Sequence, residues 1–335
     1  MAHQNTAVPP SFKAWRITHG QQVEAAVADV SLEDLTPGEV VVRTCYAGLN
    51  YKDALATTNH GKVIRHFPRI GGSDLAGLVV WSEDPRFAPG DAVMAYAGGL
   101  GVDEDGGFSE YVRLKSSRVK PVPANLSLLE AAALGVAGAT AGLAIHLLEE
   151  SGLRPDAGKV LISGATGGVG TIGIEMLAAT GYEVTAMTSK PDHDDFLRRL
   201  GAADVISTTT VTDGSRPLER ELWSAAIDNI GAGVLPWLTR TVRERGAIAS
   251  IGNAGGNALN TSVLPFILRG IRVVGINLTA YTDIEDRLWQ RISTDLRPRL
   301  LAESTHVISL DELPENIDRM LAGRSTGRIV VGLRR

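Results

Sequence analysis

Apolar and polar residues alternate over short stretches in the first third of the chain, and turns separate the apolar runs. Runs at 40–43 and 92–95 closely follow a Pro-Gly pair, and a third run lies at 78–81. Short strands separated by such turns are typical of a small barrel or sandwich. The first third is therefore predicted to form a β-domain.

The pattern changes near residue 128. The segment 128–150 is rich in Ala and Leu and predicts a helix, although glycines at 135, 138 and 142 weaken its first half. Strand-like segments then alternate with helical ones such as 171–179 and 194–200. The strand-like segments are 159–163, 183–187, 203–207, 225–228, 247–251 and 273–276. This alternation predicts an α/β domain with a parallel sheet and crossover helices.

Composition narrows the class of protein. A chain of 335 residues is long enough for two domains, and a net charge of -5 gives no reason to expect nucleic acid. We expect no apolar run of membrane-spanning length and no signal peptide, and interpret 1–11 as a loose polar tail. The single cysteine, Cys45, excludes an intramolecular disulfide and a four-cysteine zinc lobe. The cytoplasm is the expected location.

A glycine-rich turn between a strand and a helix is the strongest local motif. It reads Ser163-Gly164-Ala165-Thr166-Gly167-Gly168-Val169-Gly170, with Ala165 in place of the usual first glycine. Such glycines let backbone amides approach a pyrophosphate at a helix N-terminus. We predict that residues 166–170 bind a dinucleotide; a tight turn without ligand is the alternative.

The end of the next strand indicates which dinucleotide. NAD sites usually carry an acid about 20 residues after the glycines. Here the sequence is Thr188-Ser189-Lys190, and hydroxyls with an ammonium suit a 2′-phosphate. NADPH is the expected cofactor. The alternative is that Lys190 is a solvated loop lysine and that Asp192 or Asp194 binds the ribose.

Several motifs together resemble one family. They are Asn50-Tyr51-Lys52-Asp53, Gly71-Gly72-Ser73-Asp74-Leu75-Ala76-Gly77, Ser82-Glu83-Asp84-Pro85-Arg86-Phe87, Gly106-Gly107-Phe108-Ser109-Glu110-Tyr111, Ser215-Arg216-Pro217-Leu218-Glu219 and Pro265-Phe266-Ile267-Leu268-Arg269. With the 163–170 turn, they resemble the quinone-reductase branch of the medium-chain dehydrogenases/reductases, and most closely its acrylyl-CoA reductase group. The resemblance spans about residues 12 to 333.

The resemblance implies two domains with an active site in the cleft between them. A GroES-like β-barrel domain is expected over 1–132 with 282–335, and a Rossmann domain over 133–281. Members often form homodimers through the Rossmann sheet edge, for which the apolar stretch 271–278 is the candidate.

The resemblance also implies chemistry without zinc. Zinc-binding relatives carry a cysteine where Asn50 stands and a His-Glu pair where Ser73-Asp74 stands, and neither replacement offers the ligands that catalytic zinc prefers. His60 and His66 are interpreted as part of a solvated loop, so no metal is expected. Without a Lewis acid the enzyme must reduce an activated bond, such as a C=C bond conjugated to a thioester or quinone carbonyl.

By position in the family, Asn50 and Tyr51 line the cleft near the nicotinamide. Tyr51 is expected either to donate to the enolate or to pack against the cofactor, and both interpretations stay open. Asn50 is expected to fix the carboxamide or the thioester. Asp53 is interpreted as a structural cap, and Asp74 either orients Lys52 or holds a buried hydrogen-bond network.

Further cofactor contacts are expected at family positions and at the carboxyl ends of strands. They are Thr140, Gly252, Asn253, Ile276, Asn277 and Arg328. Local structural roles are the alternatives for Thr140 and Asn253, and surface decoration for Arg328. The basic residues Lys62, Arg65 and Arg69 are candidates for the phosphates of coenzyme A, the alternative being a solvated charged face.

The expected activity is NADPH-dependent reduction of an enoyl-thioester such as acryloyl-CoA. Two alternatives stay open. One is an NADPH quinone or enone reductase that uses the same site. The other is a non-catalytic NADPH-binding protein, against which the intact Asn50-Tyr51 pair and glycine turn argue.

Overall fold

A computed structural model describes residues 8–333 of the chain except 60, 212, 213 and 215. Most of the expected N-terminal tail, His60 and Ser215 therefore lie outside the described residues. The chain divides into two compact units, a first unit of Met1–Val136 with Thr305–Arg335 and a second unit of Ala137–Ser304. Residues 282–304 thus belong to the second unit, whereas the sequence placed them in the first.

The first unit is built of antiparallel sheets. Its seven-stranded sheet has the order β15-β16-β3-β5-β6-β8, with β7 paired to β3, and its three-stranded sheet has the order β2-β1-β4. The strands are β1 (Phe12–His19), β2 (Val23–Val30), β3 (Val40–Leu49), β4 (Arg69–Ile70), β5 (Asp74–Ser82), β6 (Ala92–Tyr96), β7 (Tyr111–Leu114), β8 (Lys120–Pro121), β15 (Thr305–Ile308) and β16 (Arg328–Gly332). Helices α1 (Tyr51–Ala56) and α9 (Leu313–Leu321) complete the unit.

The C-terminal strand joins the first unit, as the sequence predicted. Strand β16 pairs antiparallel with β3, so that Val330 lies opposite Gly48. Apolar side chains from segments far apart in the sequence, among them Leu49, Phe108 and Val331, form one buried cluster. The predicted β-domain is confirmed.

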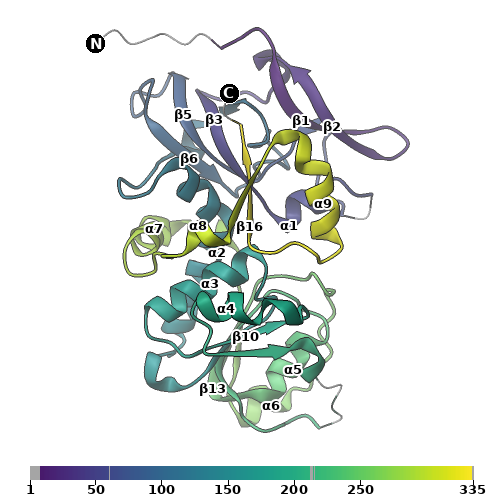
Figure 1. The fold of residues 1–335 in the computed structure, drawn as a ribbon, viewed down its shortest axis with the longest axis vertical. Helices are drawn as coiled ribbons and strands as arrows, with labels where there is room; N and C mark the ends of the chain where they lie inside the picture. The colour runs from purple at the N-terminus through teal and green to yellow at the C-terminus, as the bar shows by residue number, and fades with distance from the viewer. Residues whose placement is uncertain (1–7, 60, 212–213, 215, 334–335) are drawn as a thin grey trace. The chain divides into compact units, whose positions relative to one another are not determined.

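The second unit is a parallel sheet with helices packed around it (Figure 1). The strands are β9 (Val160–Ile162), β10 (Val184–Thr188), β11 (Asp204–Ser207), β12 (Trp223–Asp228), β13 (Val242–Ser250) and β14 (Arg272–Gly275), and the helices are α3 (Gly168–Ala179), α4 (Asp194–Arg199), α5 (Val234–Thr241), α6 (Leu264–Leu268), α7 (Glu285–Ser293) and α8 (Leu301–Ser304). The spatial order β11-β10-β9-β12-β13-β14 is the Rossmann order, in which the direction of winding reverses between the first and fourth strands. All six predicted strands are present.

Helix α2 (Leu128–Glu150) is long, apolar and broken at Gly135, where φ is 18° and ψ is -126°. By length and hydropathy it is able to cross a membrane, so the expectation that no apolar run reaches that length was wrong. Yet 94% of its most apolar window is buried inside the protein, as is usual for the core helix of a folded domain. The sequence predicted that glycines weaken the first half of this helix, and the structure shows the helix interrupted there, at Gly135.

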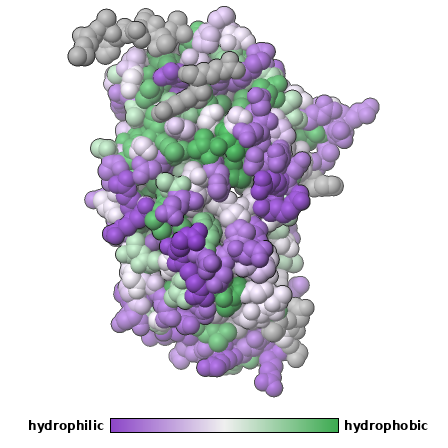
Figure 2. All heavy atoms as spheres, in the orientation of Figure 1, coloured by the Kyte–Doolittle hydropathy of each residue, from purple (hydrophilic) through white to green (hydrophobic). Residues whose placement is uncertain are grey.

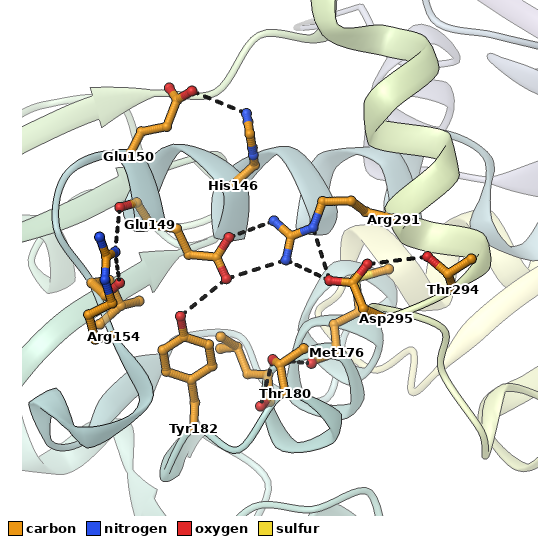
Figure 3. Close-up of polar contacts among 12 residues, drawn as sticks. His146, Glu149, Glu150, Arg154, Met176, Thr180, Tyr182, Arg291, Thr294 and Asp295 are labelled. Atoms are coloured by element: carbon orange, nitrogen blue, oxygen red, sulfur yellow. Dashed lines mark hydrogen bonds and ion pairs between the residues drawn. The ribbon is translucent and has the colours of Figure 1, made fainter.

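Helix α7 is fixed within the second unit by polar and apolar contacts with α2. Figure 3 shows the Glu149 carboxylate accepting from Arg291 Nη1 at 2.5 Å and from the Tyr182 hydroxyl at 3.1 Å. A methyl group at Gly142 would lie 3.0 Å from Ile292 Cγ1, so the two helices approach closely. These contacts explain why residues 282–304 belong to this unit.

On the face shown in Figure 2, hydrophilic and hydrophobic residues are interspersed. Apolar atoms normally contribute more than half of a protein's accessible surface, so scattered apolar groups on this face need no special explanation.

Candidate active site

The glycine-rich turn joins β9 to α3 at the carboxyl end of the sheet. Gly164 has a φ of +59°, and a methyl group at Gly170 would lie 2.5 Å from the Gly164 oxygen, so the helix packs directly on the turn. Gly167 is the N-cap of α3 and provides no side-chain cap. The first N–H groups of the helix therefore have no partner within it, which is the arrangement that binds a diphosphate. That residues 166–170 bind a dinucleotide stays a prediction, and the geometry of the turn is suited to it.

The end of β10 lies beside this turn. The Ala165 amide donates to Met187 O at 3.1 Å, and Thr188 Oγ1 accepts from the Lys190 amide at 3.1 Å. Ser189 is exposed and Lys190 half-buried. Of the two acids considered as alternative ribose ligands, Asp192 and Asp194, the second is paired with Arg198 at 2.9 Å.

Two further predicted segments follow neighbouring strand ends. Ser250 of β13 is in register with Gly275 of β14, so Gly252-Asn253 and Ile276-Asn277 leave the sheet at the same edge. A cavity of about 330 Å³ lies at the first segment and is lined by Gly231, Ala232, Leu235, Ser250, Ile251, Gly252, Asn253, Gly256, Asn257 and Ala258.

Two of the predicted cofactor residues have little freedom to contact a ligand through their side chains: that of Asn277 is hydrogen-bonded within its own turn, and that of Thr140 is buried. The side-chain oxygen of Asn277 accepts from the Thr279 amide at 3.2 Å and hydroxyl at 2.8 Å, so it closes its own turn. Thr140 is 7% exposed within α2.

In the first unit, the Asp74 carboxylate is the centre of a buried hydrogen-bond network. It accepts from the Gly48 amide at 2.5 Å, Asn50 Nδ2 at 2.9 Å, the Val136 amide at 3.0 Å and Arg328 Nη2 at 3.0 Å. Side chains on Gly48 or Gly135 would collide with this network. Of the two roles considered for Asp74, the structure supports the network.

Arg328 was expected to reach the cofactor phosphates, and this expectation was wrong. Its guanidinium is 1% exposed and donates to Asp74 and to Leu49 O at 2.6 Å and Ala133 O at 2.7 Å. Because all of these partners lie within the first unit, Arg328 serves as an internal counter-charge.

Asn50 and Asp53 stand at the start of α1, next to the Asp74 network. Asp53 Oδ2 accepts from the Asn50 amide at 2.9 Å and from the Ser73 hydroxyl at 3.0 Å, which confirms its structural capping role. Burial, together with the charge of Asp74, raises the pKa of Asp53 to about 6. Burial of two neighbouring carboxylates favours the protonated form of one of them.

The same contacts determine what Asn50 is able to do. Its Nδ2 lies 3.1 Å from Ser73 Oγ and 2.9 Å from Asp74, so its donors are engaged, and its side chain also accepts from the Asp53 backbone in the capping box of α1. Asn50 is thus unsuited to donate to an enolate, while its amide oxygen, which has two lone pairs, is able to accept one further hydrogen bond from a carboxamide. Tyr51 is half-buried, and its hydroxyl has no hydrogen-bond partner within the described part of the chain.

Three residues stand in place of zinc ligands. Of these, Asn50 donates hydrogen bonds to both of the others, Ser73 and Asp74. Across residues 8–333, apart from the four not described, no three His, Cys, Asp or Glu side chains gather as a metal site would require.

The three basic residues that were candidates for the coenzyme A phosphates differ in exposure. Lys62 and Arg65 are exposed. Arg69 is 7% exposed and pairs with the buried Asp105 at 3.3 Å, so its expected contact with substrate was wrong. Arg69 belongs to β4, whose side chains are buried, and its charge is neutralised inside the unit.

Sequence reasoning missed a polar cluster at the end of β12. Asp228 and Asn229 both contact Ser163, the residue that begins the glycine-rich turn. Strand β12 is the fourth strand of the sheet and pairs with β9, the first. Polar residues at the carboxyl end of β12 therefore indicate a binding site, but only once the strand order is known.

The chain is similar to known proteins over nearly its whole length. Residues 36–124 match an alcohol dehydrogenase GroES-like domain, and residues 168–294 match a zinc-binding dehydrogenase domain. YhfP of Bacillus subtilis (strain 168), named as a quinone oxidoreductase, is 42% identical over 318 residues, which cover 94% of this chain and 96% of the relative. Acrylyl-CoA reductase AcuI of Ruegeria pomeroyi is 37% identical, with 92% of this chain and 94% of the relative covered.

Solved structures give the same result. The yhdH oxidoreductase from Salmonella enterica in complex with NADP superimposes with a TM-score of 0.92 at 37% identity, over 96% of this chain and 100% of that one. Bacillus subtilis yhfP with NAD bound gives a TM-score of 0.92 at 41% identity, over 96% of this chain and 99% of that one.

Proposed function

Because this chain belongs to the medium-chain dehydrogenase/reductase family, in the branch of YhfP and AcuI, we propose that it reduces the C=C bond of an α,β-unsaturated thioester with NADPH. The glycine-rich turn carries this proposal. At the reversal of strand order, it presents the unpartnered N–H groups of α3 where a diphosphate is to be held. Acryloyl-CoA is the substrate that the likeness to AcuI favours.

The residues at the carboxyl edge of the sheet fit the cofactor. Residues 166–170 hold its diphosphate, and Ser189 with Lys190 hold the 2′-phosphate through charge-assisted hydrogen bonds. Gly252-Asn253 and the backbone of Ile276-Asn277 serve the nicotinamide half. When bound, NADPH supplies the hydride that is added to the β-carbon of the substrate.

In the first unit, the Asp74 network fixes the Asn50 amide, and the second lone pair of its oxygen accepts from the nicotinamide carboxamide. The Tyr51 hydroxyl donates to the thioester oxygen, where negative charge develops as the β-carbon is reduced. A proton then adds to the α-carbon, giving the saturated thioester. Lys62 and Arg65, both exposed, provide the cationic rim for the phosphates of coenzyme A.

A quinone or enone is the second candidate substrate, favoured by the likeness to YhfP. The same oxyanion donor would serve it, but Lys62 and Arg65 would have no phosphate to bind. Rates of NADPH oxidation with acryloyl-CoA, crotonyl-CoA and a simple quinone distinguish the candidates. The proposal expects the highest kcat/KM for an enoyl-CoA; a preference for the quinone would replace it.

We further propose a cytoplasmic homodimer, joined at the edge of the Rossmann sheet. Strand β14 ends the sheet, and α6 next to it exposes Ile267 by 69% and Leu268 by 62%. Pairing of two β14 strands about a twofold axis would cover these side chains in a self-complementary interface. Sedimentation of the protein tests this, with Ile267→Glu expected to give monomers.

A further inference from the structure

Ser163 lies where the second unit's sheet reverses its strand order. It follows β9, which pairs in parallel with β12, so that Ile162 lies opposite Ile227. Asp228 ends β12 and Asn229 follows it. Ligands of open parallel sheets bind outside the carboxyl ends of the strands at this reversal.

Three side-chain hydrogen bonds join the two strand ends, and two more hold the Asp228 carboxylate to the residues that follow β12. The Ser163 hydroxyl donates to Asp228 Oδ1 at 2.6 Å and accepts from the Asn229 amide at 2.9 Å. Asn229 Nδ2 donates to Ser163 O at 2.8 Å. The Asp228 carboxylate also accepts from the amides of Ile230 at 3.1 Å and Gly231 at 2.9 Å. We call Ser163, Asp228 and Asn229 the Ser163 clasp.

The clasp leaves little freedom to the residue that begins the turn. The hydroxyl and the carbonyl of Ser163 are both bonded, and the side chains of Ser163 and Asp228 are completely buried. Because Nδ2 must face the Ser163 carbonyl, the orientation of the Asn229 amide is determined as well. Gly164, next in the chain, would place an added methyl group 3.3 Å from Asn229 Cβ, so the turn rests directly on the clasp.

A buried carboxylate is a costly way to join two strands. Replacing buried charged groups by well-packed apolar groups often leaves the stability of a protein unchanged or raises it, so stability alone seldom explains a buried carboxylate. A carboxylate does, however, hold several donors at defined positions, which is what a binding turn requires.

We propose that the Ser163 clasp is a positioning device for the cofactor, which sets the place of the 164–170 turn so that its N–H groups meet the diphosphate. This rests on the proposed placement of NADPH at that turn. The clasp touches neither the 2′-phosphate nor the nicotinamide in this proposal. Its loss therefore weakens every ligand that contains the diphosphate, and weakens each by the same factor.

The experiment compares Ser163→Ala with two controls. Ser224 joins the same two strands at their other end, where its hydroxyl lies 2.9 Å from Gly158 O and 2.8 Å from Lys159 O. Ser224→Ala therefore reports the stability cost of losing a buried serine that bridges β9 and β12. Lys190→Ala reports the placement of the 2′-phosphate. Dissociation constants are measured for NADPH, NADH and adenosine 2′-monophosphate, and Tm for every variant.

For Ser163→Ala we expect Kd to rise by about fivefold to thirtyfold for NADPH and NADH alike, the loss that one or two buried hydrogen bonds produce. Adenosine 2′-monophosphate lacks the diphosphate, so its Kd should not change. Steady-state KM should rise with kcat preserved at saturation. Ser224→Ala should lower Tm without changing any Kd.

If Ser163→Ala lowers Tm as Ser224→Ala does and leaves both dinucleotide affinities intact, the clasp is structural only and the inference is overturned. If Ser163→Ala does not fold, Asn229→Ala takes its place, since Asn229 is half-buried and its loss leaves the Ser163–Asp228 bond. If Lys190→Ala binds adenosine 2′-monophosphate like the wild type, the cofactor placement itself has failed.

Discussion

The ion pair between Arg328 and Asp74, 3.0 Å from Nη2 to Oδ2, replaces the hydrogen bonds that helix α2 loses at its break. In a continuous helix Val136 N–H would donate to Ala132 O. At the break, Val136 donates to Asp74 instead, while Arg328 donates to Ala132 O at 3.4 Å and Ala133 O at 2.7 Å. The pair thus satisfies both sides of the break.

Removal of the guanidinium should therefore be severe. Arg328→Met leaves the completely buried Asp74 carboxylate without its counter-charge, a change that typically costs about 3–5 kcal/mol of unfolding free energy. Urea unfolding measures it. Lys13→Ala, which breaks the exposed Lys13–Asp29 pair at 2.8 Å, is the control and should cost no more than about 1 kcal/mol. Equal losses for the two variants would refute this role of Arg328.

Glu175 should make stability depend on pH. It is 5% exposed in α3 and accepts from the Leu300 amide at 2.6 Å, and burial raises its pKa from 4.5 to about 7. A raised pKa means that the folded state binds the proton more tightly than the unfolded state does. The resulting stabilisation is complete below pH 4.5 and is lost as pH rises through about 7.

We therefore expect wild type to lose about 3 kcal/mol relative to Glu175→Gln between pH 4.5 and pH 7, because glutamine does not titrate. Urea unfolding of both proteins across this range gives the difference. A constant difference at every pH would show that Glu175 ionises normally in the folded protein.

Lys190 should determine the choice of nicotinamide cofactor. Loss of a charged hydrogen bond to a 2′-phosphate should raise KM for NADPH by about tenfold to a hundredfold in Lys190→Ala. KM for NADH should be nearly unchanged. Lys159→Ala is the matched control, because Lys159 precedes β9 at the other end of the sheet and pairs with Glu183 at 3.6 Å. An equal loss for both cofactors would remove Lys190 from the 2′-phosphate site.

Tyr51→Phe separates the two roles that remain open for this residue. If the hydroxyl stabilises the enolate, kcat and kcat/KM should fall together by about tenfold to a thousandfold, with NADPH affinity preserved. Stopped-flow reduction of acryloyl-CoA with deuterated NADPH shows whether hydride transfer limits the rate. Near-normal kcat under a full isotope effect would mean that Tyr51 only packs against the cofactor.

The parallel sheet was predictable because its strands are local apolar runs and most of them are followed by a helix, so the sequence pattern carries the signal. The glycine-rich turn was predictable for the same reason: Gly164 and Gly170 are needed for a local backbone conformation and a local contact.

Roles that depend on distant partners were not predictable. Arg328 is neutralised by Asp74, which lies 254 residues away, and no local pattern distinguishes such an arginine from one that binds phosphate. Arg69 was grouped with Lys62 and Arg65 because they are close in sequence, yet only Arg69 meets a buried acid. Helix α7 was misassigned because its Arg291–Glu149 contact joins segments far apart in the chain.

The fate of the transferred hydride tests the central claim most directly. With acryloyl-CoA and NADPH carrying deuterium at the transferable C4 position, mass spectrometry of the product locates the label. We predict propionyl-CoA with one deuterium at the β-carbon and a solvent-derived hydrogen at the α-carbon. Formation of no propionyl-CoA, while the same enzyme oxidises NADPH with a quinone, would contradict the proposed reaction.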